Sequence, residues 1–373
     1  MLFESKALAK APFPGWPPGR FRRNLGMPLP AWKKILVVDL GFLGDTVHSV
    51  PALRALVDSG ARVDVMTTPV GGEVLAMVPA LNRIWIVPLR KPSPPFWEGL
   101  PRLWAIRSEK YDAALAWIGS DRNLFGVGWS GARDRIVRIT GKSSWPARTR
   151  LTRTVDGSDR SRPVFEQRLV FLRELGWSGK EPGWELRIPA NDRSATRSFS
   201  KKPYLHLSVN AASSPLNEWP LDDWAETLRR IWREAPQLEV LASGAGSERE
   251  NARLADLAAL VADPRLKILE ERTPVARLAA ILEGAEAHAG LDSGVLHLAV
   301  ALGKPTVSLF RESPGRPGWA PRGERHHVFI RDCPCNQSGK NACEGSRALC
   351  LSKISAQDVA QAVLSLLSKE VRG

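Results

Sequence analysis

Short runs of consecutive apolar residues recur along the chain, and most are followed by a turn and then a pattern of helical period. The first run is Ile35–Val38, and a turn containing Gly41 and Gly44 leads from it into a helical pattern. A strand that is apolar on both sides is buried on both faces of its sheet, as in parallel sheets covered by helices. The chain is therefore predicted to be an α/β protein with doubly wound parallel sheets.

The strand–helix pattern occurs in two series, separated by a segment rich in turns and charge. The expected strands are 35–38, 62–66, 84–87 and 113–118 in the first series, and 204–209, 238–242, 266–269, 287–291 and 306–310 in the second. The predicted organisation is a flexible, basic, Pro-rich arm at 1–32, Rossmann-like domains at 33–190 and 191–354, and a closing C-terminal helix within 355–373. Two such domains facing each other across a cleft are typical of the GT-B architecture, although other two-domain α/β proteins share the pattern.

Most of the excess positive charge lies in two segments. The formal net charge is +14, and residues 1–34 hold seven basic residues against one acidic. Residues 131–162, which we expect to form a loop or lid, hold nine basic against three acidic. Such segments favour an anionic partner: nucleic acid, a membrane surface or a phosphorylated substrate. They could also be plain solvated surface.

The chain has no obvious membrane or export segment. No apolar run approaches the ~18 residues needed to span a bilayer, and prolines at positions 12, 14, 17 and 18 interrupt the N-terminus where a signal peptide would be apolar. We therefore expect a cytoplasmic location.

The first strand is followed by a turn that carries an acidic residue. The chain lacks G-x-G-x-x-G and G-x-x-x-x-G-K-[ST], which disfavours a dinucleotide dehydrogenase and a P-loop NTPase. Asp45 falls at the start of a helix, where the helix dipole favours a carboxylate. Spacing alone leaves open whether Asp45 carries chemistry or only caps the helix.

A second turn, Asp292-Ser293-Gly294, also follows a strand and opens a helix. Free backbone N–H groups and a hydroxyl at such a place suit a phosphate or pyrophosphate. His297 lies one helical turn after Ser293 and either faces the same ligand or is structural. Because parallel strands bind ligands at their carboxyl ends, further candidates follow neighbouring strands: Asn210, Ser213, Asn217, Ser243, Gly244 and Glu248.

Together these pieces resemble glycosyltransferase family 9, the ADP-heptose:lipopolysaccharide heptosyltransferases. The family's motifs are a GD-x-(V/I)-x-x-x-PA-L turn, K-x-WP-x-x-x-W, GxxxE, and D-(T/S)-G-x-x-H-LA-x-ALG-(K/T)-P. The chain matches them with Gly44-Asp45, Trp219-Pro220 with Trp224, Gly244 with Glu248, and a nearly complete block from Asp292 to Pro305. The resemblance covers about residues 33–367.

The resemblance implies an inverting GT-B enzyme that moves a heptose from ADP-heptose to the inner core of lipopolysaccharide and needs no cofactor for chemistry. Asp45 would be the general base, with Gly44 and His48 on the acceptor side. The donor would contact Asn210, Ser213, Asn217, Ser243, Gly244, Glu248, Asp292, Ser293, Gly294 and His297, with Glu248 on the ribose. The expected partners are an ADP-sugar and an anionic lipopolysaccharide precursor at the inner leaflet, where the enzyme would be peripheral; nucleic acid is not expected.

One departure from the family pattern concerns charge. Asn217 stands where K-x-WP has its Lys, so that a cation is missing from the expected donor site. Arg311, after the strand at 306–310, is our candidate for supplying that charge. The alternatives are another sugar donor, a protein acceptor such as an autotransporter, or a catalytically weak nucleotide-sugar-binding scaffold.

All four cysteines fall within 18 residues, at Cys333, Cys335, Cys343 and Cys350. Disulfides are not expected in a cytoplasmic chain. Four thiolates could hold a structural Zn or Fe, although Cys333-Pro334-Cys335 lacks the usual two-residue gap. Some family members that glycosylate autotransporter proteins hold an iron there. Reduced thiols without metal are the alternative.

Overall fold

The computed structural model describes residues 29–88, 96–139, 148–157, 159–196, 202–211, 214–269, 272–312, 316–333, 343 and 348–367. Most of the predicted arm, and with it most of its charge, lies outside the described residues. The predicted arm ends too late in the chain, because its last residues pack on the first domain. The Leu29 N–H donates to Gly176 O, and the buried Trp32 donates from Nε1 to Asp134 Oδ2 at 2.8 Å.

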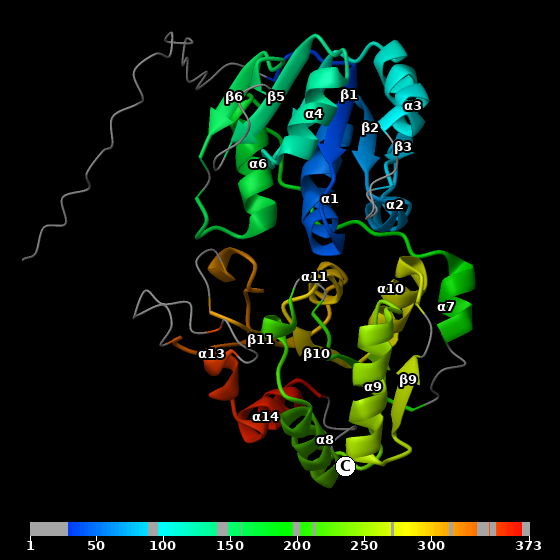
Figure 1. Ribbon diagram of the computed structural model, residues 1–373, viewed down its shortest axis with the longest axis vertical. Helices are drawn as coiled ribbons and strands as arrows, with labels where there is room; N and C mark the ends of the chain where they lie inside the picture. The colour runs from blue at the N-terminus through cyan, green and yellow to red at the C-terminus, as the bar shows by residue number, and fades with distance from the viewer. Residues whose placement is uncertain are drawn as a thin grey trace, which may run out of the picture.

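Two six-stranded parallel sheets form the centres of two domains, one above the other in Figure 1. The first has the order β3-β2-β1-β4-β5-β6. Its strands are β1 (Lys34–Asp39), β2 (Arg62–Thr67), β3 (Arg83–Ile86), β4 (Ala113–Ala116), β5 (Asp134–Ile139) and β6 (Arg153–Asp156). Its helices are α1 (Leu43–Asp58), α2 (Pro69–Leu75), α3 (Phe96–Ser108), α4 (Asp121–Trp129) and α6 (Val164–Glu174).

The second sheet has the order β12-β11-β10-β7-β8-β9. Its strands are β7 (Tyr204–Ser208), β8 (Glu239–Ser243), β9 (Leu266–Leu269), β10 (Ala287–Leu291), β11 (Thr306–Phe310) and β12 (His326–Ile330). The helices that follow the first domain are α7 (Ala190–Thr196), α8 (Leu221–Glu234), α9 (Glu248–Val261), α10 (Val275–Gly284), α11 (Gly294–Ala301), α13 (Leu349–Ser352) and α14 (Ala356–Leu366), with short 3-10 turns η1 (Pro215–Asn217) and η2 (Arg316–Gly318).

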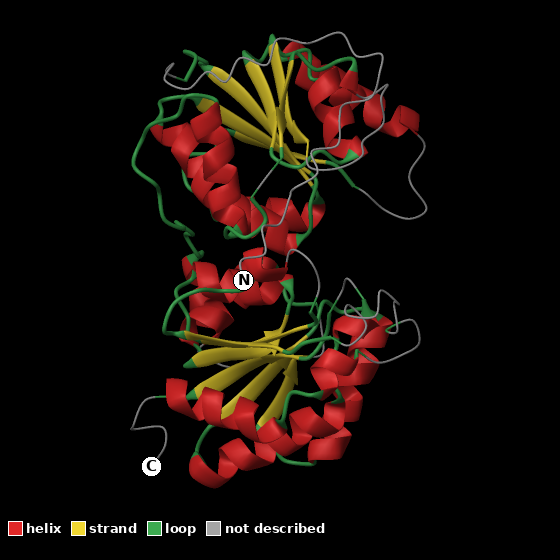
Figure 2. Ribbon diagram, turned by 90° about the vertical axis from the view of Figure 1, so that its left-hand side faces the viewer, coloured by secondary structure: helices red, strands yellow, loops and turns green. Residues whose placement is uncertain are grey.

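Helices cover both faces of each sheet (Figure 2), as the apolar strand runs predicted. Ile35 and Val37 of β1 pack in one core cluster, and Leu36 and Val38 pack in another on the opposite face. All four side chains are fully buried. The closing helix α14 packs against α8 in the second domain. The predicted fold class, two facing Rossmann-like domains, is therefore confirmed.

The prediction that 131–162 is a loop or lid is wrong, because this stretch contains β5 and β6. Both strands lie toward one edge of the sheet, where a strand need not be apolar throughout. Arg138 of β5 is buried, and its guanidinium pairs with Glu174 of α6 at 2.6 Å. Because both strands contain charged residues, they do not form the continuous apolar runs from which the other strands were predicted.

Among the described residues, none of the helices has both the length and the apolar character needed to cross a membrane.

Candidate functional site

The two domains meet where the first turn of α1 crosses the first turn of α11. A Cβ atom on Gly44 would lie 2.6 Å from Cδ2 of His297, and one on Gly294 would lie 2.6 Å from Cβ of Leu43. Real Cβ atoms do not approach other atoms so closely, so the absence of a side chain at both glycines permits the contact. Two helix N-termini, each carrying partial positive charge, thereby face one region.

A cavity of about 400 Å³ lies at this junction. Each sheet reverses its strand order here, between β1 and β4 and between β7 and β10, and such switch points are where open α/β sheets bind ligands. The cavity brings together nine of the predicted residues: Gly44, Asp45, Asn210, Ser243, Gly244, Asp292, Ser293, Gly294 and His297.

Asp45 enters the cavity from the first domain. Its carboxylate accepts the Phe42 N–H at 3.0 Å, so it also caps α1, and its side chain is 17% exposed. Asp45 therefore caps the helix and also lines the cavity.

Behind Asp45 lies a buried arginine that the sequence analysis missed. Arg168 of α6 donates to the Asp45 carbonyl oxygen and to Ser49 Oγ, and its Nη2 lies 3.6 Å from Asp45 Oδ1. Ser49 in turn donates to the buried Asp39. Burial raises the pKa of the Asp39 carboxyl, and the Arg168 guanidinium opposes that rise. The fixed cation beside Asp45 limits the rotation of its carboxylate.

A signal for Arg168 was present in the sequence. It shares the spacing of Phe165, Leu169 and Leu172 on the apolar face of its helix. A cation on such a face needs a buried anion, and here that anion comes from another element.

His48, predicted on the acceptor side, lies behind His297 and does not line the cavity. Its Nε2 is 3.1 Å from His297 Nδ1, and the Trp319 ring lies 5.2 Å from both imidazoles between centroids. Burial lowers the pKa of His48 well below its usual value and that of His297 to about 4. A neutral pair is the result, and His48 orients His297.

The turn after β10 lines the cavity from the second domain. Ser293 caps α11 by position, and its buried Oγ has no hydrogen-bond partner among the described residues. Asp292 forms an ion pair with Arg316, and its Oδ1 lies 3.7 Å from His297 Nε2. Ser293 Oγ and the first N–H groups of α11 are suited to an anionic oxygen.

Asn210 is a second buried polar group available to a ligand. It follows β7, is 4% exposed, and neither of its amide atoms has a hydrogen-bond partner within the described part of the chain. By contrast, the Ser243 hydroxyl is 3.0 Å from Nε2 of the buried His206. The predicted Ser213 lies outside the described residues.

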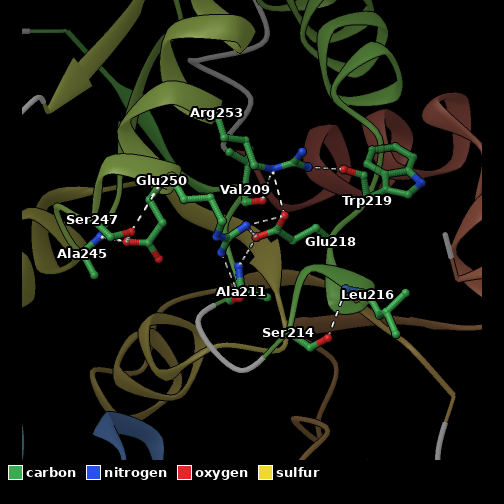
Figure 3. Close-up of polar contacts among 11 residues, drawn as sticks. Val209, Ala211, Ser214, Leu216, Glu218, Trp219, Ala245, Ser247, Glu250 and Arg253 are labelled. Carbon is green, nitrogen blue, oxygen red and sulfur yellow. Dashed lines mark hydrogen bonds and ion pairs between the residues drawn. The ribbon is translucent and has the colours of Figure 1, made fainter. Parts of the chain in front are cut away.

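The acidic residue of α9 that lines the cavity is Glu250, not the predicted Glu248. Glu248 is exposed, whereas Glu250 is 5% exposed and accepts from the Ala245 N–H and Ser247 Oγ, both at 3.0 Å (Figure 3). The GxxxE spacing fits Gly246 with Glu250 as well as Gly244 with Glu248. Ser247 caps α9, so the helix starts two residues before Glu250 and turns Glu250 inward.

The segment around Asn217 is anchored by its neighbour, Glu218. Figure 3 shows the Glu218 carboxylate accepting from the Ala211 N–H at 3.0 Å, with Arg253 close by. Arg249 donates to both oxygens of Glu218, at 2.8 and 3.0 Å. Asn217 is buried and does not line the cavity.

Arg311, our candidate for the missing charge, does not line the cavity either, whereas Arg316 does. Arg316 lies five residues further along, at the start of η2, where it reaches Asp292. Because Arg316 lies beyond the turn that directly follows β11, the sequence pattern gives no sign that it reaches the site.

The described cysteines do not form a metal site. Cys333, Cys343 and Cys350 are buried, and no disulfide joins them in the described structure; Cys335 lies outside the described residues. Burial raises the pKa of the Cys350 thiol, which also hydrogen-bonds Cys333. No group of three or more potential metal ligands gathers anywhere in the described ranges. The predicted structural Zn or Fe is thus unsupported.

Comparison with known proteins agrees with this geometry. The family model "Glycosyltransferase family 9 (heptosyltransferase)" matches residues 136–347, more than half of the chain. Lipopolysaccharide heptosyltransferase 1 of Pseudomonas aeruginosa is 26% identical, over 90% of this chain and 98% of that protein. Lipopolysaccharide heptosyltransferase 2 of Escherichia coli is 24% identical, over 77% of this chain and 85% of that protein.

Solved structures show the same fold. The E. coli ADP-heptose lipopolysaccharide heptosyltransferase II superposes with a TM-score of 0.70 at 20% identity, covering 90% of this chain and 99% of that chain. A family 9 glycosyltransferase of Veillonella parvula gives 0.75 at 19% identity, covering 90% of this chain and 97% of that one. The chain belongs to glycosyltransferase family 9, and it is a glycosyltransferase of the GT-B fold.

Proposed function

We propose that the enzyme transfers a heptose from ADP-heptose to the inner core of lipopolysaccharide, with inversion at the anomeric carbon. The observation that carries the proposal is the shared cavity: Asp45 enters it from the first domain, and the N-terminus of α11 enters it from the second. The relatives from P. aeruginosa and E. coli, both lipopolysaccharide heptosyltransferases, support the choice of sugar and acceptor.

In this mechanism Asp45 is the general base. The acceptor hydroxyl attacks the anomeric carbon from the side of the first domain, and its proton passes to the Asp45 carboxylate. A carboxylate is a weak base toward a sugar hydroxyl, so proton transfer is late and positioning contributes much of the rate. Arg168 and the bond from the Phe42 N–H supply that positioning.

The donor lies against the second domain. Its diphosphate faces Ser293 and the free N–H groups of α11, which stabilise the negative charge that grows on the leaving ADP. Glu250 accepts hydrogen bonds from the ribose hydroxyls, a role first assigned to Glu248. The buried amide of Asn210 makes a further polar contact with the nucleotide.

We also infer that the enzyme works at the inner leaflet of the cytoplasmic membrane, as a peripheral protein. The support is the excess of basic residues in 1–34 and 131–162, apart from the buried Arg138, since each cation near an anionic leaflet contributes about 1 kcal/mol. The acceptor is itself an anionic lipid, so the same charge serves both contacts.

The test is transfer by the purified protein. We expect incubation with ADP-heptose and a heptose-deficient lipopolysaccharide to add the mass of one heptose to the acceptor, and a deletion strain to lack that heptose. A deletion strain with an unchanged core would refute the acceptor. Transfer from another nucleotide sugar but not from ADP-heptose would refute the donor.

A further inference from the structure

Two arginines are among the described residues that line the cavity, although the lysine of the family pattern is replaced by Asn217. Arg272 and Arg316 both line the cavity, and the two differ in their partners. A diphosphate that leaves with an electron pair needs compensating charge, so the question is which arginine supplies it.

Arg272 takes part in the contact between the two domains. Its guanidinium pairs with Glu73 of α2, and the same carboxylate accepts the Val275 N–H at the start of α10, at 2.9 Å. Its side chain is 58% exposed. Arg272 therefore helps to fasten α10 to α2, and solvent screens its charge.

Arg316 is placed differently. Its side chain is 25% exposed, and it forms an ion pair with Asp292, which immediately precedes the N-terminal turn of α11. The guanidinium lines the cavity beside that turn and presents N–H donors in a planar fork. It thus adds a cation to a site where Ser293 Oγ and the helix dipole already favour an anion.

The ion pair between Asp292 and Arg316 also explains why an acidic residue can lie beside a site proposed to bind an anion. The Asp292 side chain is 7% exposed, and a carboxylate there would repel a diphosphate unless a cation stood between them. His297 does not supply that charge, because burial keeps its pKa at about 4. Arg316 is the cation in contact with Asp292 in the described structure.

We propose that Arg316 donates hydrogen bonds to the diphosphate of the sugar donor, and that Asp292 is a positioning residue that holds the guanidinium in place. The inference rests on the proposed function for the identity of the donor. In the transfer step the acceptor oxygen bonds to the anomeric carbon and the bond from that carbon to the diphosphate oxygen breaks. The electron pair leaves with the diphosphate, beside Arg316, and the acceptor proton goes to Asp45.

The experiment measures binding of ADP, adenosine and inorganic pyrophosphate by calorimetry, together with kcat. Because a charge-assisted hydrogen bond is lost, Arg316→Gln should lower the affinity for ADP and for pyrophosphate about 10- to 100-fold. The affinity for adenosine, which has no phosphate, should stay within about twofold of the wild-type value. Because the charge grows toward the transition state, kcat should fall by about 100-fold. Arg316→Lys should recover part of both losses, as it keeps the charge without the planar fork. Arg311→Gln is the matched control and should resemble the wild type.

The double variant Asp292→Asn with Arg316→Gln separates contact from structural damage. If Arg316→Gln acts only by leaving a buried carboxylate without its partner, the double variant regains ADP affinity, and the proposal fails. If Arg316 contacts the diphosphate, the double variant stays as weak as Arg316→Gln. Wild-type affinity for ADP in Arg316→Gln, or equal weakening of adenosine, also overturns the proposal.

Failure of the proposed function is distinguishable from failure of this inference. Wild-type protein that binds UDP or GDP in place of ADP refutes the donor, and the same variants measured on that nucleotide still test Arg316. Wild-type protein that binds ADP without transferring heptose refutes the reaction alone. Binding of none of the three nucleotides overturns both.

Discussion

The imidazoles of His48 and His297 face each other across the domain boundary, with 3.1 Å between Nε2 of the first and Nδ1 of the second. One side chain comes from α1 and the other from α11, so the contact exists only while the two domains are together. Both imidazoles are buried and neutral, and each pairs edge-on or tilted with Trp319. The pair links the position of the first domain to a residue of the second domain that lines the cavity.

The free energy of unfolding should fall as the pH is lowered from 6.5 toward 4. The folded-state pKa of His297 is about 4, below the unfolded value of 6.5, so within this window the unfolded chain binds the extra proton. The contribution is therefore complete above pH 6.5 and decreases on acidification, by ~1.4 kcal/mol per pH unit for each such imidazole. Urea unfolding at pH 7, 6, 5 and 4.5 measures it. The slope should be shallower in His297→Gln, whereas the raised pKa of Asp39 acts oppositely and equally in both proteins. Equal slopes would contradict the assignment.

Asp45→Asn should abolish transfer while preserving the donor site. The amide oxygen can still accept the Phe42 N–H, but it cannot take the acceptor proton, so kcat should fall by about 10²- to 10⁴-fold. ADP affinity, measured by calorimetry, should change little. Asp58→Asn, at the other end of the same helix, removes an exposed carboxylate and should be neutral. Retained turnover in Asp45→Asn would reject Asp45 as the base.

Arg168→Met should be among the most destabilising substitutions in the first domain. It leaves the carboxylate of Asp39 buried without its cation, and such losses cost about 3–5 kcal/mol. The loss is measured by chemical denaturation. Adding Asp39→Asn removes the second charge and should recover part of the stability. A loss below about 1 kcal/mol in the single variant would show that the network is not coupled as described.

Gly294→Ala should impair transfer more than it impairs stability. The new Cβ would lie 2.6 Å from Leu43 Cβ, so α1 and α11 must move apart, and the domains can do so without unfolding. A misplacement of about 1 Å at a reacting centre is enough to cost ~10²-fold in rate. Gly99→Ala in α3 is the control, since its Cβ would meet nothing within 4 Å. Wild-type kcat in Gly294→Ala would show that the close contact is dispensable.

Glu250→Gln should weaken ADP about 10-fold, whereas Glu248→Gln should not. The glutamine keeps its place in the first turn of α9 but loses the charge that strengthens hydrogen bonds from ribose hydroxyls. Comparison of ADP with adenine in the same titration locates the loss, because adenine lacks the ribose. If Glu248→Gln lowered the affinity for ADP more than Glu250→Gln does, Glu248 rather than Glu250 would be the residue that contacts the ribose.

Nine of the twelve described strands, and the two turns that meet at the cavity, are predictable from the sequence alone. Ile35–Val38 predicts a buried parallel strand because such a strand must be apolar on both faces. This requirement is met within a few consecutive residues, so it can be recognised in the sequence. Gly44-Asp45 and Asp292-Ser293-Gly294 were found in the same way, since a strand-to-helix turn and its capping chemistry span only a few residues. The strands β5 and β6 escaped because charged residues interrupt their apolar pattern near the sheet edge.

Which charges face each other depends on how distant elements pack in three dimensions. Arg168 and Asp39 are 129 positions apart, and Arg316 reaches Asp292 from a turn beyond the next strand. The choice between Glu248 and Glu250 depended on where α9 begins, because two residues rotate a side chain to the far side of a helix. Electrostatic partners interact through space. The sequence pattern therefore identifies the charged groups that need a partner, whereas the packing of helices and sheets determines which partner each group meets.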